Sequence, residues 1–509
     1  MVKICSRRSV EGSSLRRSSS GAGYAPVRDS RSAGEMVLGE DIVVGWLCTG
    51  LISPFWQSLV DKPTKSQWHR YDAYADRVRT ITFNENSYIM RQRNTAITAE
   101  LIDTLVNLHP QSAFCPPKLR KMDWMTTGTE SSFAMVPFLC DTLEDLGVYL
   151  YAGTEVAREL IEQVAGRTPG LKSLCLDLPS GLQNPLVLWL SKSPLLESLS
   201  LPANYQKTGM LRALGSLVNL KRLKLGYDVD SEDERTAQCP SFNPTPAFPR
   251  LETLEIGAPL DRLAQTFQTP EQFGQLKQVV LSSANPTPEW LLNLSTAVAR
   301  RCLGVIAITL DLWFSDPSRT CRLSFQHIRP FLACHSLKIL NFETSNPFSV
   351  DEQDLEDMAQ AWPGIEELNL SPRPDEDMHR GGFPLRYLPI AAGLFPALKR
   401  LRIYLDPMGG GLEFDYKIIP SSEFQSLEVL DIGASSVPSN DPVALGFIIG
   451  ALCKHEIRIV GEFESLERYS SETDLEWSKV QDVVTKLVKS KRTIHEDWTI
   501  TRKPQTARF

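Results

Sequence analysis

The chain has 509 residues, of which 42% are apolar and 23% are charged, and its formal net charge is −7. This acidic balance argues against general nucleic-acid binding, which usually needs a basic face. The length exceeds one ordinary globular core and suits an array of repeats. The ten cysteines form no C-x-x-C pair, which favours free buried thiols in a reducing compartment over disulfides or a zinc site.

The N-terminal part divides into two predicted segments. Residues 1–35 are rich in Arg and Ser and carry few apolar side chains, so they cannot offset the entropy lost on ordering. We predict a disordered basic tail there; a mitochondrial transit peptide is the weaker alternative, because no helical apolar face is visible. Residues 36–76 form the second segment, which we predict to be helical and which ends in a short amphipathic helix over residues 61–76.

An uncharged stretch lies inside that second segment. Residues 42–60 are long enough to cross a bilayer, but Pro54 and several small or polar residues interrupt them. We therefore predict a buried helix pair, with a membrane anchor as the alternative.

From residue 77 onward, one phrase of the form L-x-x-L-x-L recurs. A clear copy lies in Ser193–Asn204, where Asn204 follows the last leucine by three places. From Val78 to Leu427 the copies span 349 residues in twelve steps, or about 29 residues per copy, at the long end of the range for leucine-rich repeats. The leading apolar positions of the thirteen copies are Val78, Leu119, Leu143, Leu171, Leu196, Leu220, Leu251, Leu276, Val305, Leu337, Ile365, Leu398 and Leu427.

Each copy predicts one strand of a parallel sheet. Because alternate residues of a strand face opposite sides, Leu401 and Ile403 should be buried while Arg400 and Arg402 should be exposed. One copy cannot bury its own leucines, but stacked copies form a continuous core. With helices between the strands, the fold class is α/β: a leucine-rich-repeat solenoid, or horseshoe, with a parallel sheet on the concave face and helices on the convex face.

The segments between the strands carry helix and turn signals. Apolar residues recur at helical spacing in Glu155–Ala165, Pro288–Arg300 and Leu355–Ala361. Residues 226–247 and 371–393 are predicted loops, and the acidic residues of the first loop are interpreted as a solvated insertion. Six prolines stand two residues before a leading position and should stop the helix and preset an extended approach to the strand: Pro117, Pro169, Pro194, Pro249, Pro363 and Pro396.

The array covers residues 77–465, and residues 466–509 form a C-terminal capping helix and tail. A solenoid needs a cap with a polar outer face, and residues 474–490 have the required pattern. The predicted apolar side of this helix carries Leu475, Val480, Val483, Val484, Leu487 and Val488.

No pattern for catalysis, cofactor binding or metal binding is visible. None of the seven histidines stands in a metal spacing, and we interpret all of them except His335, which precedes a predicted strand, as ordinary surface or loop residues. The triple glycine Gly409–Gly411 lacks the Lys-Ser/Thr of a phosphate-binding loop. Asn369 matches a glycosylation pattern but falls inside a predicted strand, so we discount it. We predict that the chain is not an enzyme, with no cofactor and no metal.

The concave face is the remaining candidate site, and its charged residues alternate in blocks of opposite sign. Aligning neighbouring copies places Lys224 beside Glu255, Arg400 beside Glu367, and Arg402 beside Asp431. One interpretation is a ladder of exposed ion pairs, and the other is a groove for a protein partner. The predicted partner-binding residues are Lys221, Arg222, Lys224, Glu252, Glu255, Glu366, Glu367, Lys399, Arg400, Arg402, Glu428 and Asp431.

Several stretches resemble one family. Phe55-Trp56-Gln57-Ser58-Leu59, Trp68, the run Tyr74–Arg79 and the Pro-x-Leu-x-x-Leu-x-Leu copies resemble the F-box and leucine-rich-repeat-like proteins of mushroom-forming fungi. The resemblance covers about residues 46–460. No Leu-Pro-x-Glu-type helix precedes Trp46, so the F-box is degenerate or truncated.

The resemblance implies a substrate-receptor subunit of an SCF-type ubiquitin ligase, working in the cytoplasm, the nucleus or both. A protein substrate would bind the concave face. A Skp-type adaptor, and through it a cullin, would bind near Trp46, Leu51 and Trp56. The alternative is a stand-alone scaffold with no ligase role; on either interpretation we expect neither a nucleic-acid nor a membrane partner.

Overall fold

The structure of the chain is a computed structural model. It describes residues 2–4, 63–85, 99–109, 115–202, 205, 208–226, 248–268, 273–314, 321, 323–345, 348–372, 382–406, 422–435, 437, 442–461 and 472–501. The predictions for residues 42–60, for Asn204 and for the acidic part of the first loop lie outside these residues.

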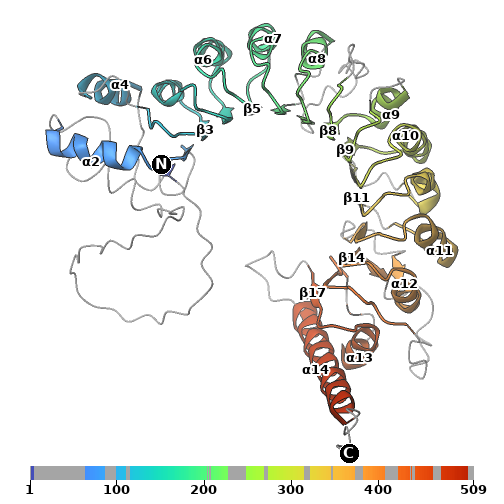
Figure 1. Ribbon diagram of the computed structural model, residues 1–509. Helices are drawn as coiled ribbons and strands as arrows, with labels where there is room; N and C mark the ends of the chain where they lie inside the picture. Colours follow the sequence, from blue (N-terminus) through green and yellow to red (C-terminus); the bar gives the residue numbers. More distant parts are fainter. Residues whose placement is uncertain are drawn as a thin grey trace, which may run out of the picture. The chain divides into compact units, whose positions relative to one another are not determined.

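The chain divides into two compact units. The first comprises Met1–Tyr205 with Arg212–Leu220, and the second comprises Gln206–Leu211 with Lys221–Phe509. In each unit the strands line the concave side and the helices the convex side (Figure 1). The helix α8 (Thr208–Gly215) is divided between the units, because its residues up to Leu211 belong to the second and those from Arg212 to the first.

The first unit is a sheet with the order β1-β2-β3-β4-β5-β6, parallel from β2 to β6. Its strands are β1 (Val2–Ile4), β2 (Thr80–Asn84), β3 (Lys121–Thr126), β4 (Asp145–Leu150), β5 (Ser173–Asp177) and β6 (Ser198–Leu201). Its helices are α2 (Lys65–Ala75), α4 (Ala99–Leu108), α5 (Thr129–Phe133), the 3-10 helix η1 (Val136–Phe138), α6 (Thr154–Ala165) and α7 (Gln183–Ser191).

The second unit continues the same pattern in a parallel sheet ordered β7-β8-β9-β10-β11-β12-β14-β16-β17. Its strands are β7 (Arg222–Leu225), β8 (Thr253–Gly257), β9 (Gln278–Ala284), β10 (Ala307–Trp313), β11 (Ile339–Thr344), β12 (Glu367–Leu370), β14 (Arg400–Ile403), β16 (Val429–Asp431) and β17 (Arg458–Val460), with a separate pair β13 (Phe383–Pro384) and β15 (Leu405–Asp406). Its helices are α9 (Leu260–Gln268), α10 (Pro288–Arg301), η3 (Phe325–His327), η4 (Arg329–Ala333), α11 (Glu352–Ala361), η6 (Leu385–Tyr387), α12 (Leu388–Leu394), α13 (Pro442–Leu452) and α14 (Glu472–Thr501).

All thirteen predicted copies form a strand, and each strand begins two residues after its leading apolar position. Every leading side chain is buried, with at most 5% of its surface exposed. In β14 the alternation is as predicted, because Leu401 and Ile403 are buried while Arg400 and Arg402 are not. The described strands and helices therefore form an α/β solenoid of the leucine-rich-repeat type.

Beside the separate pair of β13 and β15, the long sheet of the second unit contains one more parallel strand than the sequence predicted. β17 pairs with β16 in register and carries the buried Ile459. Its leading position is held by Glu456 rather than by an apolar residue. Because this copy lacks the leading apolar residue, the sequence pattern did not reveal it.

The prolines act as turn residues. In four copies the amide of the leading residue donates to the carbonyl of the residue before the proline: Leu119 to Pro116, Leu196 to Ser193, Ile365 to Trp362, and Leu398 to Phe395, at 3.1 to 3.2 Å. Each proline therefore occupies the second position of a β-turn, which its fixed φ favours. The expected extended approach is wrong for these four copies.

The short helix predicted over residues 61–76 is confirmed as α2, which begins at a capping box between Thr64 and Gln67. Trp68 of this helix is buried, and its ring packs edge-on against His109 at a centroid distance of 4.7 Å. The His109 side chain is 1% exposed and pairs with Asp72 at 3.1 Å. His109 lies just after α4 and is buried, so of its two interpretations, as a surface or a loop residue, the first is wrong.

Two further boundaries differ from the predictions. Residues 2–4 of the predicted disordered tail form β1, antiparallel to β2. Residues 382–394, in the predicted loop 371–393, contain β13, η6 and α12, whose apolar residues Leu388, Ala391 and Ala392 are buried. The short apolar run in α12 is too brief to give a helical period in the sequence.

The C-terminal cap is a pair of packed helices, α13 and α14. Val480, Val484 and Val488 of α14 are buried, but Leu475 is 59% exposed, so its predicted place on the apolar side is wrong. Trp477 is buried instead, and its indole N–H donates to the carbonyl of Ser435 at 2.9 Å.

Two glycines of α13 allow the close approach of α14. A Cβ at Gly446 would lie 2.6 Å from the Cβ of Val483, and one at Gly450 would lie 3.0 Å from Leu487 Cδ2. No real pair of carbon atoms tolerates the shorter distance, so a larger residue at Gly446 would force the helices apart.

Candidate protein-interaction face

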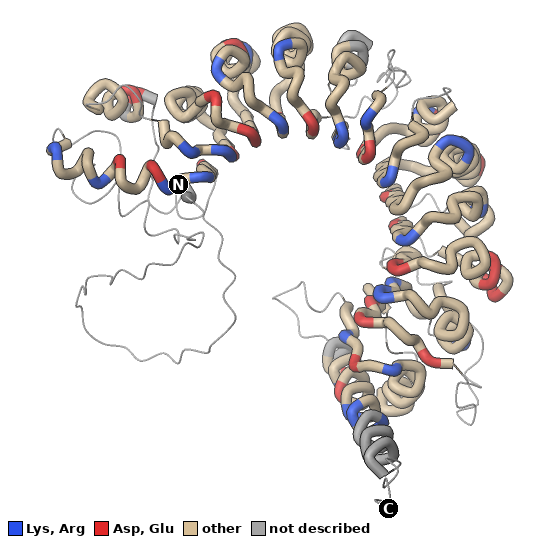
Figure 2. Tube along the Cα trace, in the orientation of Figure 1, with Lys and Arg blue, Asp and Glu red and all other residues tan. Residues whose placement is uncertain are grey.

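The exposed face of each sheet consists of outward-pointing strand residues and the residue just before each strand. The opposite strand residues are buried against the helices, as the burial patterns of β7 and β14 show. Figure 2 shows that charged segments gather along this strand side in both units. We call it the strand face.

The position directly after each leading apolar residue forms a row of charges, which we call the first row. Its backbone is continuous within each unit, because each amide in the row donates to the carbonyl of the preceding copy at 2.7 to 2.9 Å. In the first unit the row reads Arg79, Arg120, Glu144, Lys172 and Glu197, and its signs alternate from Arg120 onward. In the second unit the signs alternate except at Ile306, and the row reads Lys221, Glu252, Lys277, Ile306, Lys338, Glu366, Lys399 and Glu428.

Six of these residues were missed by the sequence analysis as residues of this face: Arg79, Arg120, Glu144, Lys172, Lys277 and Lys338. In the sequence each of these residues stands one place after a leading apolar position. Their alternating charges become visible only when the copies are aligned and this one position is compared from copy to copy.

The ion pairs predicted from the register are confirmed. Lys224 Nζ lies 2.5 Å from Glu255 Oε1, and Arg400 Nη1 lies 2.9 Å from Glu367 Oε1. Both pairs join residues that face each other on adjacent strands. Arg222 lies opposite the uncharged Thr253, so it is not brought beside a predicted acid in this register.

In the first row, one carboxylate serves two lysines. Glu366 accepts from Lys338 at 2.9 Å and from Lys399 at 2.6 Å. Hydrogen bonds from these two ammonium groups lower the pKa of Glu366 to about 2, and the same contact raises the pKa of Lys399. Glu252 similarly pairs with Lys277 at 3.1 Å.

Arg402 differs from its neighbours because it holds a buried carboxylate. Its Nε lies 3.6 Å from Asp431 Oδ2, and the Asp431 side chain is only 6% exposed. Its Nη1 also lies 3.8 Å from Glu343 Oε1, across the intervening strand β12. Asn369 of β12 is fully buried and donates from Nδ2 to Glu343 at 3.0 Å, which agrees with discounting it as a glycosylation site.

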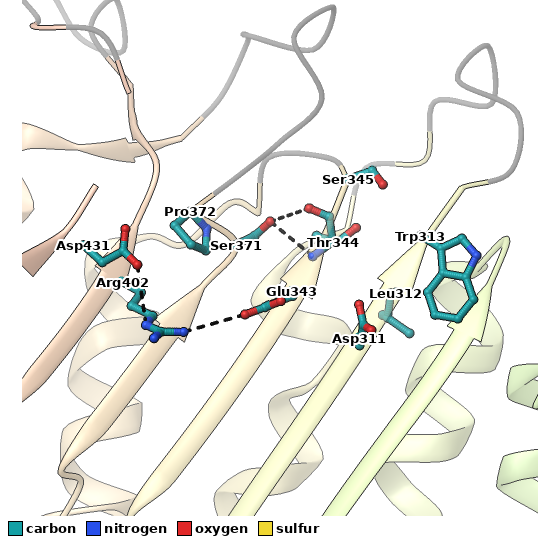
Figure 3. A pocket seen from close by; sticks show the side chains of 10 residues that line it. All are labelled: Asp311, Leu312, Trp313, Glu343, Thr344, Ser345, Ser371, Pro372, Arg402 and Asp431. Carbon is teal, nitrogen blue, oxygen red and sulfur yellow. Dashed lines mark hydrogen bonds and ion pairs between the residues drawn. The ribbon is translucent and has the colours of Figure 1, made fainter. Parts of the chain in front are cut away.

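A pocket of about 180 Å³ opens beside Arg402 at the C-terminal ends of β10, β11 and β12 (Figure 3). Asp311 and Glu343 face each other there on adjacent strands. Burial, with the Glu343 charge adding to it, raises the pKa of Asp311. The rim is fixed by the Ser371 hydroxyl, which donates to the carbonyl of Thr344 at 2.7 Å.

These charges have partners within the chain, and exposed pairs of this kind are each worth about 0.2–1 kcal/mol. The strand face is therefore pre-organised rather than strongly stabilising. A role in partner binding for the twelve predicted residues stays a prediction.

No metal-binding group was found among the described residues. Over the same residues, no helix is both long and apolar enough to span a bilayer. The seven cysteines that the structure describes are all free. Cys302, Cys334 and Cys453 are buried, as predicted, whereas the other four are only half-buried.

Among the comparisons with known proteins, only the search of solved structures found proteins similar to this chain. No protein-family model matches the chain, and no curated protein matches its sequence. Similar solved structures include an internalin from Listeria monocytogenes, at 13% identity and a TM-score of 0.32, covering 83% of this chain and 90% of its own. Rad7, solved in complex with Elc1 in yeast, has 12% identity and a TM-score of 0.37, covering 80% and 92%.

TLR13, solved with an ssRNA13, has 13% identity and a TM-score of 0.33 over 64% of this chain and 47% of its own. The chain thus spans less than half of that protein. At such identities and TM-scores the fold assignment rests on the strands and helices of this chain.

Arg402 and Arg400 should respond differently to loss of charge. Arg402→Met leaves the buried Asp431 carboxylate without its cation, so the free energy of unfolding should fall by about 1–3 kcal/mol. Arg400→Met, the matched control, removes an exposed pair and should change it by no more than about 0.5 kcal/mol. Urea denaturation followed by circular dichroism measures both, and equal effects would contradict the structural role of Arg402.

Proposed function

We propose that the protein is a non-catalytic scaffold that binds a protein partner on the strand face of its second unit. One observation carries the proposal: one side of the parallel sheet is buried under helices, while the other presents exposed side chains from β7 to β17. A rigid sheet fixes these side chains relative to one another, so little entropy is lost when a partner binds.

The charge pattern favours a protein over a nucleic acid. Lysines, arginines and carboxylates alternate along the face, and the chain as a whole has a formal charge of −7. A phosphate backbone would be repelled by every second residue of the first row. A protein surface can match both signs, which gives specificity and orientation.

The strand face can be tested by charge reversal that leaves Arg402 in place. Lys399→Glu combined with Arg400→Glu should weaken capture of a partner, because both residues are about half exposed on the strand face. The matched control, Arg300→Glu with Lys486→Glu, reverses two exposed cations on α10 and α14 and should leave capture unchanged. Affinity purification with quantitative mass spectrometry measures capture, and circular dichroism checks folding.

If both double variants capture the partner as well as the wild-type chain does, Lys399 and Arg400 do not belong to the binding surface. Retained capture after similar reversal of Arg222 and Lys224 would then reject the strand face as a whole.

A finer proposal makes the scaffold a substrate receptor of an SCF-type ubiquitin ligase, in the cytoplasm, the nucleus or both. Its support is the run Tyr74–Arg79, which spans the end of α2 and the approach to the first repeat strand, as a helical module ahead of a repeat array requires. The receptor would catalyse nothing and would act by tethering its substrate near the ligase. The stand-alone scaffold is the alternative.

Co-purification separates the two. The full chain should form a complex with a Skp-type adaptor at micromolar concentration, and Trp46→Ala with Trp56→Ala should abolish it. Capture of the strand-face partner should survive that change. If the folded wild-type chain forms no adaptor complex, the ligase proposal fails and the stand-alone scaffold is left.

A further inference from the structure

In the second unit the alternation of the first row breaks at one residue. Ile306 stands between Lys277 and Lys338, where alternation would place an acid. The register is unambiguous, because the Ile306 amide donates to the Lys277 carbonyl and the Lys338 amide donates to the Ile306 carbonyl, both at 2.8 Å. Ile306 is 37% exposed, so an aliphatic side chain faces solvent between two cations.

Among the described residues, both lysines have their acidic partners on the side away from Ile306. Lys277 pairs with Glu252, and Lys338 pairs with Glu366. An ammonium group has three N–H donors, so each of the two lysines can donate a further hydrogen bond to a carboxylate of a partner. The acidic position that the row lacks is thus open to a group from a partner.

The residues beyond Ile306 form an uncharged window. Along β9, β10 and β11 the next two aligned sets are Gln278 with Ala307 and Ile339, then Val280 with Thr309 and Asn341. The strands on either side of the window carry charged pairs at the corresponding positions, Lys224–Glu255 and Arg400–Glu367. Interface centres are depleted of charge and ringed by polar residues, which is the arrangement seen here.

The window ends at two carboxylates. Asp311 and Glu343 are aligned on β10 and β11 and line the pocket with Trp313 (Figure 3). Among the described residues Asp311 has no ion-pair partner, and the nearby Arg402 is already engaged by Asp431. The pocket therefore carries surplus negative charge beside an aromatic ring, a setting that favours a guanidinium or ammonium group.

The two charged ends are five residues apart along β10, or about 17 Å. This distance matches roughly three turns of an α-helix or five residues of extended chain. A single short segment of a partner can therefore reach both ends. A nucleic acid fits poorly, because its phosphates would meet Asp311 and Glu343.

We propose that this strip, from Lys277, Ile306 and Lys338 to Asp311 and Glu343, binds a segment of a partner protein that runs from acidic through aliphatic to basic side chains. The acidic end lies at the two lysines, the aliphatic part covers Ile306 and Ile339, and a Lys or Arg enters the pocket. The inference rests on the proposed function and specifies the partner's chemistry.

A random 12-residue peptide library displayed on phage tests this directly with the full chain. Selected binders should be enriched in the acidic–aliphatic–basic order. Fluorescence anisotropy on synthetic copies should show a loss of affinity of about thirtyfold or more for Ile306→Glu and for Asp311→Lys, the size expected of hot-spot residues. Leu292→Glu, which changes an exposed leucine of α10, is the matched control and should bind within about twofold of wild type.

Folding does not confound the test. A glutamate at 306 would stand between two lysines as Glu366 does, so Ile306→Glu should melt at or above the wild-type temperature. Binders indifferent to both strip substitutions, or an absence of binders, would overturn the inference. Binders that depend on Lys399 and Arg400 but not on Ile306 would overturn it and leave the proposed function standing.

Discussion

The burial of the leading apolar side chain in each copy determines which residues of that copy lie on the strand face. The leading residue, from Val78 to Leu427, packs inside and fixes where its strand begins two residues later. Neighbouring copies then hydrogen-bond in the same register, and each column of the phrase becomes a row across the sheet. A shift of one residue in any copy would turn its leucines outward and break the rows.

The rows explain why charge on this face does not mark the binding site by itself. Lys399, Glu366 and Lys338 satisfy one another, as do Lys224 and Glu255. Such pairs contribute little to stability and offer a partner few unused charges. In the second unit the informative position is the one that breaks the alternation, because Ile306 leaves two lysines without an acid between them.

The sequence predicted those parts of the fold and site that depend on period and register. The pair Lys224–Glu255 needed only the spacing of two copies, and its contact follows from the parallel alignment. The contact of Arg402 with Glu343 crosses a strand and depends on the length and direction of the arginine side chain, which a column alignment does not contain.

The repeat pattern also could not predict contacts made by residues outside the repeats. His109, just after α4, pairs with Asp72 of α2, 37 residues away, and neither residue belongs to the phrase. β17 was not predicted because Glu456 stands at its leading position in place of an apolar residue. In each case a tertiary contact compensated for a missing local signal.

Photo-cross-linking tests the central claim, that a partner sits on the strand face over β10. A benzophenone side chain placed at residue 306 should cross-link a selected binding peptide, while the same group at residue 292 on α10 should not. Cross-linking from 292 with none from 306 would contradict the account.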